Sequence, residues 1–336
     1  MKAYIKAISY YLPERVVTNE ELVMEFPEWT VDKIASKVGV DCRHIAGEDQ
    51  TAADMATLAA ERLFEEHNIY KQSVDFVVLC TQSPDYKLPT SACMIQDRLG
   101  LRSNIGAFDF NLGCSGYVYG LAIAKGLIAG GIAGNVLLLT SETYNKHLHP
   151  RDKGNRTIFG DAATATLVST EGYAEIGNFS LGTDGSGAEN LIVHTGAMRN
   201  PAPKGDLTFD ENGNPTSSDY LYMNGSEIFS FTQSNVPVVV RDTLSKNGLE
   251  HSDINMFVFH QANKYMLNFL RKKLKIEEER FYINMASVGN TVSNSIPLAL
   301  YEAHKEGRLL NNVLLCGFGV GYSWGGVVLK YHTDNE

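Results

Sequence analysis

Cysteine is scarce in this sequence, and the spacings that build metal sites or disulfide frameworks are lacking. The 336 residues contain five cysteines, scattered without a CxxC pair: Cys42, Cys80, Cys93, Cys114 and Cys316. Disulfide-stapled secreted domains have a denser set of cysteines, and structural zinc sites use paired ones. We therefore expect a cytoplasmic protein that holds no metal ion.

The sequence also has no excess of positive charge and no long uninterrupted apolar run. The chain has 29 Lys and Arg against 39 Asp and Glu, a net charge of -10, which disfavours nucleic acid and anionic lipid as partners except at a local basic patch. Residues 121–139 are largely apolar, but Lys125 and Asn135 interrupt them, which favours a buried helix and strand over a membrane span. The N-terminal residues lack the layout of a signal peptide. We expect no nucleic-acid partner and no membrane insertion.

What the sequence does contain is an alternation of strand-like and helix-like segments. Amphipathic or alanine-rich stretches at 52–67 and 117–130 lie among short apolar runs. The predicted strands are 76–80, 107–110, 136–140, 163–169, 256–260, 313–316 and 326–331. This alternation indicates an α/β fold with helices layered on sheets.

The two halves of the chain resemble each other. VDFVVLC, which ends at Cys80, is similar to INMFVFH, which ends 180 residues later at His260. NVLLL and NVLLC repeat at nearly the same spacing, as do the loops that carry Cys114 and Asn290. We infer two copies of one α/β unit, residues 1–172 with the cysteine and 173–336 with the histidine and asparagine. Equivalent strand-end loops should then meet at the junction and form a site there.

Residues 183–218 connect the halves and are rich in Gly, Asn, Pro and Asp. A loop of this length is usually functional or disordered. It is either an excursion beside the substrate pocket or a plain surface loop.

Cys114 lies in FDFNLGCSGYVYGL, which predicts a strand, a tight turn and a helix. A cysteine at a helix N-terminus has its thiolate stabilised by free backbone N–H groups, which should lower its pKa. Gly113 and Gly116 leave room for a substrate beside the sulfur. The alternative is an inert buried cysteine. We predict a nucleophile, which should react with alkylating reagents ahead of the other cysteines.

His260 in FVFHQAN and Asn290 in SVGNTVSNS are the expected partners of Cys114. Alone, the histidine fits a satisfied core residue and the asparagine fits a turn or helix cap. Together, a neutral imidazole N–H and an amide N–H could both donate to one thioester oxygen and stabilise an enolate.

The glycine-rich segment GFGVGYSWGG follows a predicted strand. Such loops can cradle phosphate, but no helix evidently follows this one. We expect Gly319 and Gly321 to shape an oxyanion hole beside Cys114.

The motifs YLPERVVTNEEL, GCSGYVYGL, RTIFGDAAT, HQAN, GNT and GFGVGYSWGG occur in the order typical of the β-ketoacyl-[acyl carrier protein] synthase III family, which the chain resembles over nearly its whole length. The resemblance implies a thiolase-like five-layer αβαβα fold built from two duplicated halves, a homodimer, and a catalytic triad of Cys114, His260 and Asn290. It implies acyl transfer to Cys114 followed by decarboxylative condensation with malonyl-ACP, which gives a β-ketoacyl-ACP and starts fatty-acid synthesis or a related pathway.

The same resemblance implies no tightly bound cofactor. The substrates would be thioesters of CoA or of the phosphopantetheine of acyl carrier protein (ACP), the partner protein. Leu88 and Phe159 would line the acyl pocket, with Leu88 closing the tunnel of the other subunit, and Asn263 and Lys153 would contact pantetheine or CoA. The family's adenine clamp is altered, because Lys153 stands where the family has an arginine and Lys33 holds the position nearest its tryptophan.

Basic residues cluster after His260 in an otherwise acidic chain. Helical spacing predicts that Arg271, Lys272 and Lys275 share one broad face. Charge runs are commonly just solvated, but a helix that starts at a catalytic histidine could steer an acidic carrier protein.

Alternatives within and beyond the family's superfamily stay open. A thiolase would use a second cysteine in the terminal glycine loop, and Cys316 stands close to that loop. A synthase of the hydroxymethylglutaryl-CoA type would need a glutamate base, and chalcone-synthase-like enzymes lack this C-terminal pattern. A specialised-metabolite ketosynthase with a non-acetyl or carrier-bound donor is the main alternative, and a non-catalytic partner subunit would be expected to have lost Cys114.

Overall fold

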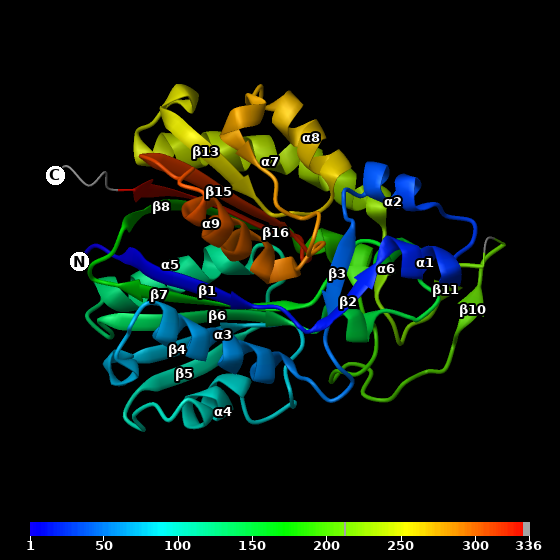
Figure 1. Ribbon diagram of the computed structural model, residues 1–336, viewed down its shortest axis with the longest axis horizontal. Helices are drawn as coiled ribbons and strands as arrows, with labels where there is room; N and C mark the ends of the chain where they lie inside the picture. The colour runs from blue at the N-terminus through cyan, green and yellow to red at the C-terminus, as the bar shows by residue number, and fades with distance from the viewer. Residues whose placement is uncertain (212, 332–336) are drawn as a thin grey trace.

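The computed structural model describes residues 1–211 and 213–331. Their centre is one ten-stranded mixed sheet, in the order β14-β13-β15-β16-β8-β1-β7-β6-β4-β5 (Figure 1). The first half of the chain supplies β1 (Tyr4–Tyr11), β4 (Phe76–Cys80), β5 (Gly106–Phe110), β6 (Asn135–Glu142) and β7 (Ala162–Ser169). The second half supplies β8 (Ala174–Thr183), β13 (Ile254–Phe259), β14 (Phe281–Tyr282), β15 (Asn312–Gly319) and β16 (Ser323–Tyr331).

The strand order of one half repeats in the other. β4 pairs in parallel with β5 and β6, and β13 pairs in parallel with β14 and β15. β7 then runs antiparallel between β6 and β1, as β16 does between β15 and β8. An antiparallel contact between β1 and β8 joins the two five-stranded groups. The similar sequence segments therefore occupy equivalent places, while the division at residues 172 and 173 stays a prediction.

Helices complete five layers, which confirms the αβαβα fold class (Figure 1). α5 (Gly116–Ala129) and α9 (Ser295–Lys305) lie between the two strand groups. α3 (Ala52–Glu66) and α4 (Ser91–Arg98) cover the outer face of the first group. α7 (Gly225–Asn247) and α8 (Lys264–Lys273) cover the outer face of the second.

Local sequence explains these elements. α3 begins with a capping box between Thr51 and Asp54, and α7 ends at Gly248 with φ 65°. α5 is apolar on most of its surface because strands pack on both of its sides. Its Gly120 lies so close to β6 that a Cβ there would be 2.5 Å from a Leu138 methyl carbon.

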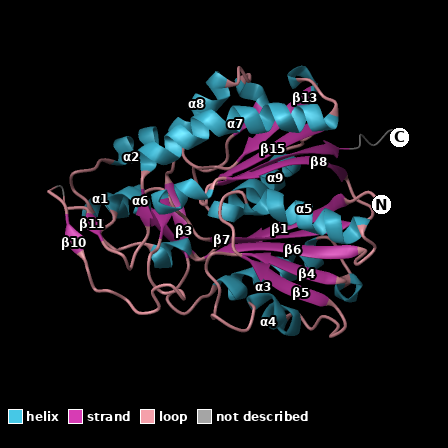
Figure 2. Cartoon of the chain, turned by 180° about the vertical axis from the view of Figure 1, so that it is seen from behind, coloured by secondary structure: helices cyan, strands magenta, loops and turns pink. Residues whose placement is uncertain are grey.

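A smaller region lies at one end of the sheet (Figure 2). It contains α1 (Asn19–Glu25), α2 (Val31–Lys37), α6 (Lys153–Arg156) and the hairpin of β2 (Arg15–Thr18) and β3 (Cys42–Ile45). The predicted loop at 183–218 passes through the same region and forms a 3-10 helix, η3 (Gly185–Asn190), and short pieces of sheet. These are β9 (Leu191–Ile192), β10 (Thr208–Phe209) and β11 (Pro215–Thr216); β9 pairs with β12 (Tyr222–Met223).

All seven predicted strands are present: 76–80 has the predicted ends, and the other six have ends shifted by up to three residues. Three strands of the central sheet, β1, β8 and the two-residue β14, were missed. β1 and β8 combine buried and exposed residues and have no long apolar run. They become the centre of the sheet only because the two halves pair there. No helix among the described residues is long and apolar enough to cross a membrane.

Candidate active site

Cys114 lies two residues before α5, in the turn that follows β5. Gly116 N–H donates to the Gly113 carbonyl at 2.8 Å and closes this turn. A Cβ at Gly116 would lie 2.3 Å from Cys80 Sγ, so the turn needs glycine there. The strand, turn and helix predicted around the cysteine are therefore present.

Burial controls the ionisation of Cys114. The residue is 8% exposed, and burial raises the pKa of its thiol to about 12, with the buried Glu142 carboxylate adding to the effect. The helix terminus acts in the opposite direction, but such a terminus contributes at most about 2 kcal/mol. The expected lowering of this pKa is therefore wrong for the resting site, because no cationic side chain among the described residues offsets the desolvation of the thiolate.

The glycine-rich loop approaches Cys114 through one of its two predicted residues. A Cβ at Gly319 would lie 2.9 Å from Cys114 Cβ and 3.1 Å from Sγ. At Gly321, with φ 135°, the nearest atoms belong to Ser323 instead. Gly319 therefore leaves the open space beside the sulfur, and Gly321 shapes the turn into β16.

His260 follows β13 and is 2% exposed. Its backbone N–H donates to the Cys316 carbonyl at 2.9 Å, and its Nδ1 lies 2.7 Å from Ser295 Oγ. The imidazole also meets the ring of Phe318 edge to face, with centroids 5.6 Å apart. Burial lowers the pKa of His260 to about 3, so the imidazole is neutral near pH 7.

Asn290 is buried, and its amide is fixed by the backbone. Its Oδ1 accepts a hydrogen bond from Val292 N–H at 2.9 Å, which leaves the amide N–H2 as the group free to donate. Its own N–H donates to the Ile158 carbonyl at 2.8 Å, and Gly160 N–H donates to its carbonyl at 3.0 Å.

The segment after Asn290 is strained. Val292 has φ 56°, a left-handed conformation that costs a β-branched residue about 1–2 kcal/mol. Its carbonyl accepts from Ser295 Oγ at 2.9 Å, and Ser295 holds His260. The strained turn therefore links the asparagine to the histidine.

An apolar cluster surrounds Cys114 and brings the two halves together. Its buried members are Cys114, Tyr144, Leu148, Phe159, Leu191, Leu221 and Val292. The predicted pocket residue Phe159 belongs to this cluster. Leu88, by contrast, is 80% exposed and lies outside it.

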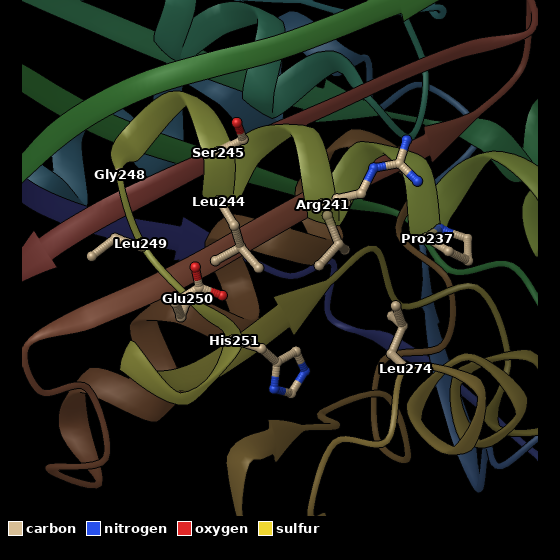
Figure 3. A pocket seen from close by; sticks show the side chains of 10 residues that line it. Pro237, Arg241, Leu244, Ser245, Gly248, Leu249, Glu250, His251 and Leu274 are labelled. Atoms are coloured by element: carbon tan, nitrogen blue, oxygen red, sulfur yellow. The ribbon is translucent and has the colours of Figure 1, made fainter.

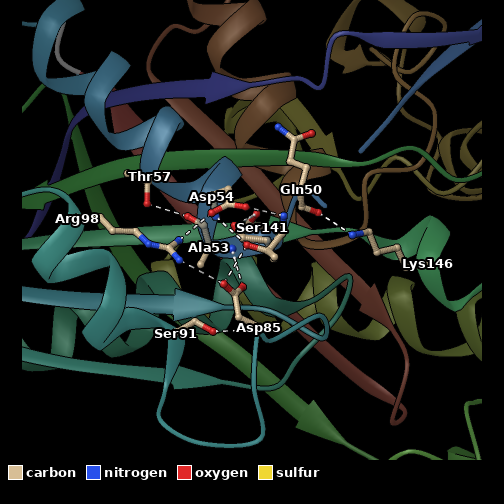
Figure 4. Close-up of polar contacts among 11 residues, drawn as sticks. Gln50, Ala53, Asp54, Thr57, Asp85, Ser91, Arg98, Ser141 and Lys146 are labelled. Carbon is tan, nitrogen blue, oxygen red and sulfur yellow. Dashed lines mark hydrogen bonds and ion pairs between the residues drawn. The ribbon is translucent and has the colours of Figure 1, made fainter. Parts of the chain in front are cut away.

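The segment that carries Leu88 is anchored at its base (Figure 4). Asp85 accepts hydrogen bonds from Thr51 Oγ1 at 2.9 Å and from Ala53 N–H at 3.1 Å, at the start of α3. Its N–H donates to Ser91 Oγ, at the start of α4. The anchored turn presents Leu88 and the 62% exposed Tyr86 to the exterior.

Some of the residues predicted to contact the carrier protein or CoA already have partners within the chain, whereas others are exposed. Lys153 forms an ion pair with Glu28, and Asn263 caps α8 by accepting from Met266 N–H at 2.8 Å. Lys272 and Lys275 are exposed. α8 ends at Lys273 and Lys275 follows it with φ 55°, so the prediction that Lys275 shares a helical face with Arg271 and Lys272 is wrong. Arg271 is largely buried, where it lies 3.4 Å from both Glu278 and the Ile276 carbonyl.

Two surface grooves lie on this side of the molecule. One, of about 580 Å³, runs between α2 and α8 and is lined by Ser36, Lys37, Lys264, Tyr265, Asn268, Phe269 and Lys272. The other, of about 620 Å³, lies between α7 and residues 248–251 (Figure 3) and includes none of the candidate site residues. Of these two grooves, the one between α2 and α8 is lined by basic residues of α8, Lys264 and Lys272.

Sequence reasoning missed Glu142, a carboxyl with no exposed surface at the end of β6. It accepts hydrogen bonds from Gln82 N–H at 3.0 Å, Ser83 Oγ at 3.1 Å and Ser293 Oγ at 3.3 Å. Burial raises its pKa to about 8. The signal in the sequence was an acidic residue two positions after the predicted apolar strand 136–140.

Cys316 does not take the place of a thiolase's second cysteine. It lies within β15 with no exposed surface, and its residue pairs with Gly326 of β16. Burial raises the pKa of its thiol well above its usual value. The thiolase alternative thus loses the residue that suggested it.

The fold and the cysteine at its centre define a condensing acyltransferase of the thiolase fold. Models of 3-oxoacyl-[acyl-carrier-protein] synthase III match residues 108–185, and models of its C-terminal region match residues 244–331. The β-ketoacyl-[acyl-carrier-protein] synthase III of Caldanaerobacter subterraneus subsp. tengcongensis is 35% identical over 96% of this chain and 95% of its own.

Solved structures agree. A crystal structure of a 3-oxoacyl-(acyl-carrier-protein) synthase III matches with a TM-score of 0.96 and 49% identity, over 98% of this chain and 100% of its own. A 3-oxoacyl-(acyl-carrier protein) synthase from Burkholderia xenovorans LB400 matches with a TM-score of 0.90 and 35% identity, over 98% and 94%. The chain belongs to the 3-oxoacyl-[acyl-carrier-protein] synthase III family.

Proposed function

We propose that the chain condenses an acyl thioester with malonyl-ACP to give a β-ketoacyl-ACP, the reaction that starts fatty-acid synthesis, with Cys114 as the acyl carrier. The observation that supports this most is that one strand, β15, contacts the cysteine at Gly319 and the histidine at the adjoining Phe318. Cys114 itself lies before α5.

In the first half-reaction the acyl group moves to the cysteine. Cys114 Sγ bonds to the thioester carbonyl carbon, the bond from that carbon to the donor sulfur breaks, and the thiol proton leaves with the donor as its free thiol. The N-terminal N–H groups of α5 stabilise the sulfur as it loses its proton. The space that Gly319 leaves beside Sγ receives the carbonyl.

In the second half-reaction malonyl-ACP loses CO2. The electron pair released moves onto the thioester as an enolate, and its α-carbon bonds to the acyl carbon on Cys114. The bond from that carbon to Sγ then breaks, and Cys114 leaves as a thiolate that takes up one proton from water to become the thiol again. His260 Nε2–H and Asn290 Nδ2–H donate to the enolate oxygen. His260 has that proton on Nε2 in the arrangement where Ser295 turns its single hydroxyl hydrogen from the Val292 carbonyl to Nδ1. Asn290 is oriented by Val292 N–H.

The substrates arrive as thioesters of CoA or of ACP phosphopantetheine, and no tightly bound cofactor takes part. The exposed Lys272 and Lys275 of the α8 region, with Arg271 behind them, attract the acidic carrier. Lys153 and Asn263 lie along the pantetheine or CoA path, and Phe159 lines the acyl pocket. Leu88 closes the tunnel of the second subunit in a homodimer that works in the cytoplasm.

An assay with purified chain, an acyl-CoA panel and malonyl-ACP tests this function. We expect CO2 release and a β-ketoacyl-ACP product, both abolished in Cys114→Ala. A chain that releases no CO2 from malonyl-ACP but cleaves β-ketoacyl-CoA would be a thiolase. A chain that does neither would be a non-catalytic partner.

A further inference from the structure

The buried carboxyl of Glu142 lies beside the turn that carries Cys114 and takes no part in the two half-reactions described above. Ser293 Oγ donates to Glu142 Oε1 at 3.3 Å. Ser293 also lies against the turn, because a Cβ at Gly116 would be 3.5 Å from Ser293 Cβ. A negative charge on Glu142 disfavours the Cys114 thiolate. The protonation state of Glu142 therefore bears on the nucleophile.

The hydrogen-bond partners of Glu142 allow it to hold a proton. Ser83 and Ser293 meet it with hydroxyl groups, whose oxygens can accept from a carboxyl as well as donate to a carboxylate. The nearby buried Asp161 instead accepts from two N–H groups of Asn145, each at 3.0 Å, and N–H groups can only donate. Burial raises the pKa of both carboxyls, that of Glu142 to about 8. Of the two, Glu142 is the one whose partners suit a neutral carboxyl.

The titratable groups that face Glu142 are Cys80, Cys114, Tyr144, Asp161 and, through Ser83, His147. Burial raises the pKa of both thiols and of the phenol, and it lowers the pKa of the imidazole. These four groups are therefore uncharged near pH 7. None of the five supplies a positive charge that would offset a carboxylate at Glu142.

A chain of hydrogen bonds joins Glu142 to a cavity of about 800 Å³ that opens beside the apolar cluster around Cys114. Ser83 Oγ lies 3.1 Å from Glu142 Oε2 and 3.3 Å from His147 Nε2. His147 is half-buried and lines the cavity. Its hydrogen bonds within the described chain are made by Nε2, which leaves Nδ1 for water in the cavity.

A proton can pass along this chain and leave the histidine neutral. While Glu142 is a carboxylate, Ser83 donates to it, and His147 Nε2–H donates to Ser83 and to the Gln82 carbonyl. When a hydronium ion in the cavity protonates Nδ1, the Nε2 proton passes to Ser83 Oγ and the Ser83 hydrogen passes to Oε2. The carboxyl has then gained one proton, the hydronium ion has become water, and the hydrogen bonds between these three side chains have reversed direction.

We propose that Glu142 takes up a proton from the cavity through His147 and Ser83, and that in this neutral form it allows Cys114 to leave as a thiolate during condensation. The proposal rests on the condensation described above. When the bond from the acyl carbon to Sγ breaks, a negative charge remains on a buried sulfur. A carboxylate beside it would repel that charge, whereas a neutral carboxyl would not. Glu142 acts through Cys114 and does not touch the substrate.

The pH dependence of condensation tests the role of Glu142. Cys114 is loaded from an acyl-CoA, and product formation from malonyl-pantetheine is then measured in single turnovers at about pH 6.5 and about pH 9.5. Glu142 loses its proton as the pH rises through about 8, so the wild-type rate should fall about three- to tenfold between these two values. In Glu142→Gln the side chain is neutral at both, and its amide can still donate to Ser83. The ratio of its two rates should be near one.

Glu61→Gln, the same change on α3, is the matched control and should retain the wild-type ratio. A loss of structure would lower both rates and leave the ratio as it is, and thermal unfolding would confirm that the variants fold at both pH values. A wild-type ratio near one, or a fall that persists in Glu142→Gln, would overturn the proposal. No product at either pH would overturn the condensing function, and the proposal with it.

A pH jump tests the route through His147. Loaded enzyme at about pH 9.5 is mixed to about pH 6.5 together with malonyl-pantetheine. The wild type should reach its full rate without delay, because the chain of hydrogen bonds returns the proton to Glu142. In His147→Phe, which has a ring but no nitrogen, the initial rate should be about three- to tenfold below the later rate. His304→Phe, at the exposed end of α9, should show no delay. The absence of a delay in His147→Phe would overturn this route.

Discussion

Cys114, His260 and Glu142 are all buried, and burial favours the uncharged form of each side chain. It raises the pKa of Cys114 to about 12 and that of Glu142 to about 8, and it lowers the pKa of His260 to about 3. At rest the site therefore contains a thiol, a neutral imidazole and a carboxyl whose pKa is near 8. A neutral imidazole suits a hydrogen-bond donor to an enolate oxygen. A protonated thiol means that acyl transfer must generate the thiolate within the site.

Acyl loading of Cys114 should therefore accelerate with pH. The thiol pKa is raised above its usual value, so between pH 7 and 9 the thiolate fraction grows about tenfold per pH unit. Loading from an acyl-CoA, measured by mass spectrometry in single turnovers, should follow that slope, and Cys114→Ser should accumulate no acyl-enzyme at these times.

Alkylation gives a complementary readout. Cys93 is exposed whereas Cys114 is buried with a raised pKa, so iodoacetamide at pH 7 should label Cys93 first. This revises the order expected from the sequence. Labelling of Cys114 ahead of Cys93 would show that the helix terminus outweighs burial.

Replacing His260 or Asn290 should separate the two half-reactions. Without one donor to the enolate oxygen, decarboxylation and condensation should fall by about a hundredfold or more, while acylation of Cys114 persists better. Because the pKa of His260 is lowered to about 3, wild-type decarboxylation should show no loss from histidine protonation between pH 8 and 5. Equal loss of both half-reactions in Asn290→Ala, or an acidic limb near pH 6.5 that His260→Ala removes, would contradict these roles.

At the scale of elements, α8 joins the site to the surface. Asn263 caps the helix three residues after His260, and the exposed Lys272 and Lys275 lie at its far end. Arg271 is instead engaged with Glu278 and the Ile276 carbonyl. The lysines, more than the arginine, are free to meet an acidic partner.

Changing Lys272 and Lys275 to Glu should raise the KM for malonyl-ACP severalfold, because repulsion replaces attraction toward the acidic carrier. The KM for malonyl-pantetheine should hardly change, and the wild-type KM for malonyl-ACP should rise with salt. Lys305→Glu, at the end of α9, is the matched charge reversal on another element. If both substrates suffer alike, the lysines support the fold and not the partner.

At the scale of the whole molecule, exposed apolar side chains occur near the opening of the cavity beside Cys114. Tyr86 and Leu88 project from a turn that Asp85 anchors, and Met198, which lines the cavity near Cys114, is also exposed. A second copy of the chain that covered this face would bury these side chains and close the cavity.

Leu88→Asp should therefore weaken a homodimer and lower condensing activity together. Light scattering at micromolar concentration should report a dimer for the wild type and a shift toward monomer for the variant. Ile132→Asp changes an exposed apolar residue elsewhere and should leave the dimer intact. A fully active monomeric wild type would refute the proposed closure by Leu88.

The sequence by itself determined the repeating α/β unit and most of its strands, because apolar runs and turn residues are local signals. It also singled out Cys114, His260 and Asn290, because the repeat places the loops of Cys114 and Asn290 in equivalent positions and puts His260 at the end of a strand equivalent to the one that ends at Cys80. Helix capping at Thr51 and the glycine after α7 are likewise local.

The tertiary structure alone decided what depends on pairing and burial. β1 and β8 are central only because the two halves join there. The pKa of Cys114 is set by desolvation and by Glu142, which lies far from it in the sequence. The hydrogen bonds of Gln82 with Asn111 and with Glu142 exist only because β4, β5 and β6 end beside one another. No local pattern encodes such contacts, because they arise when distant segments exclude water from one another.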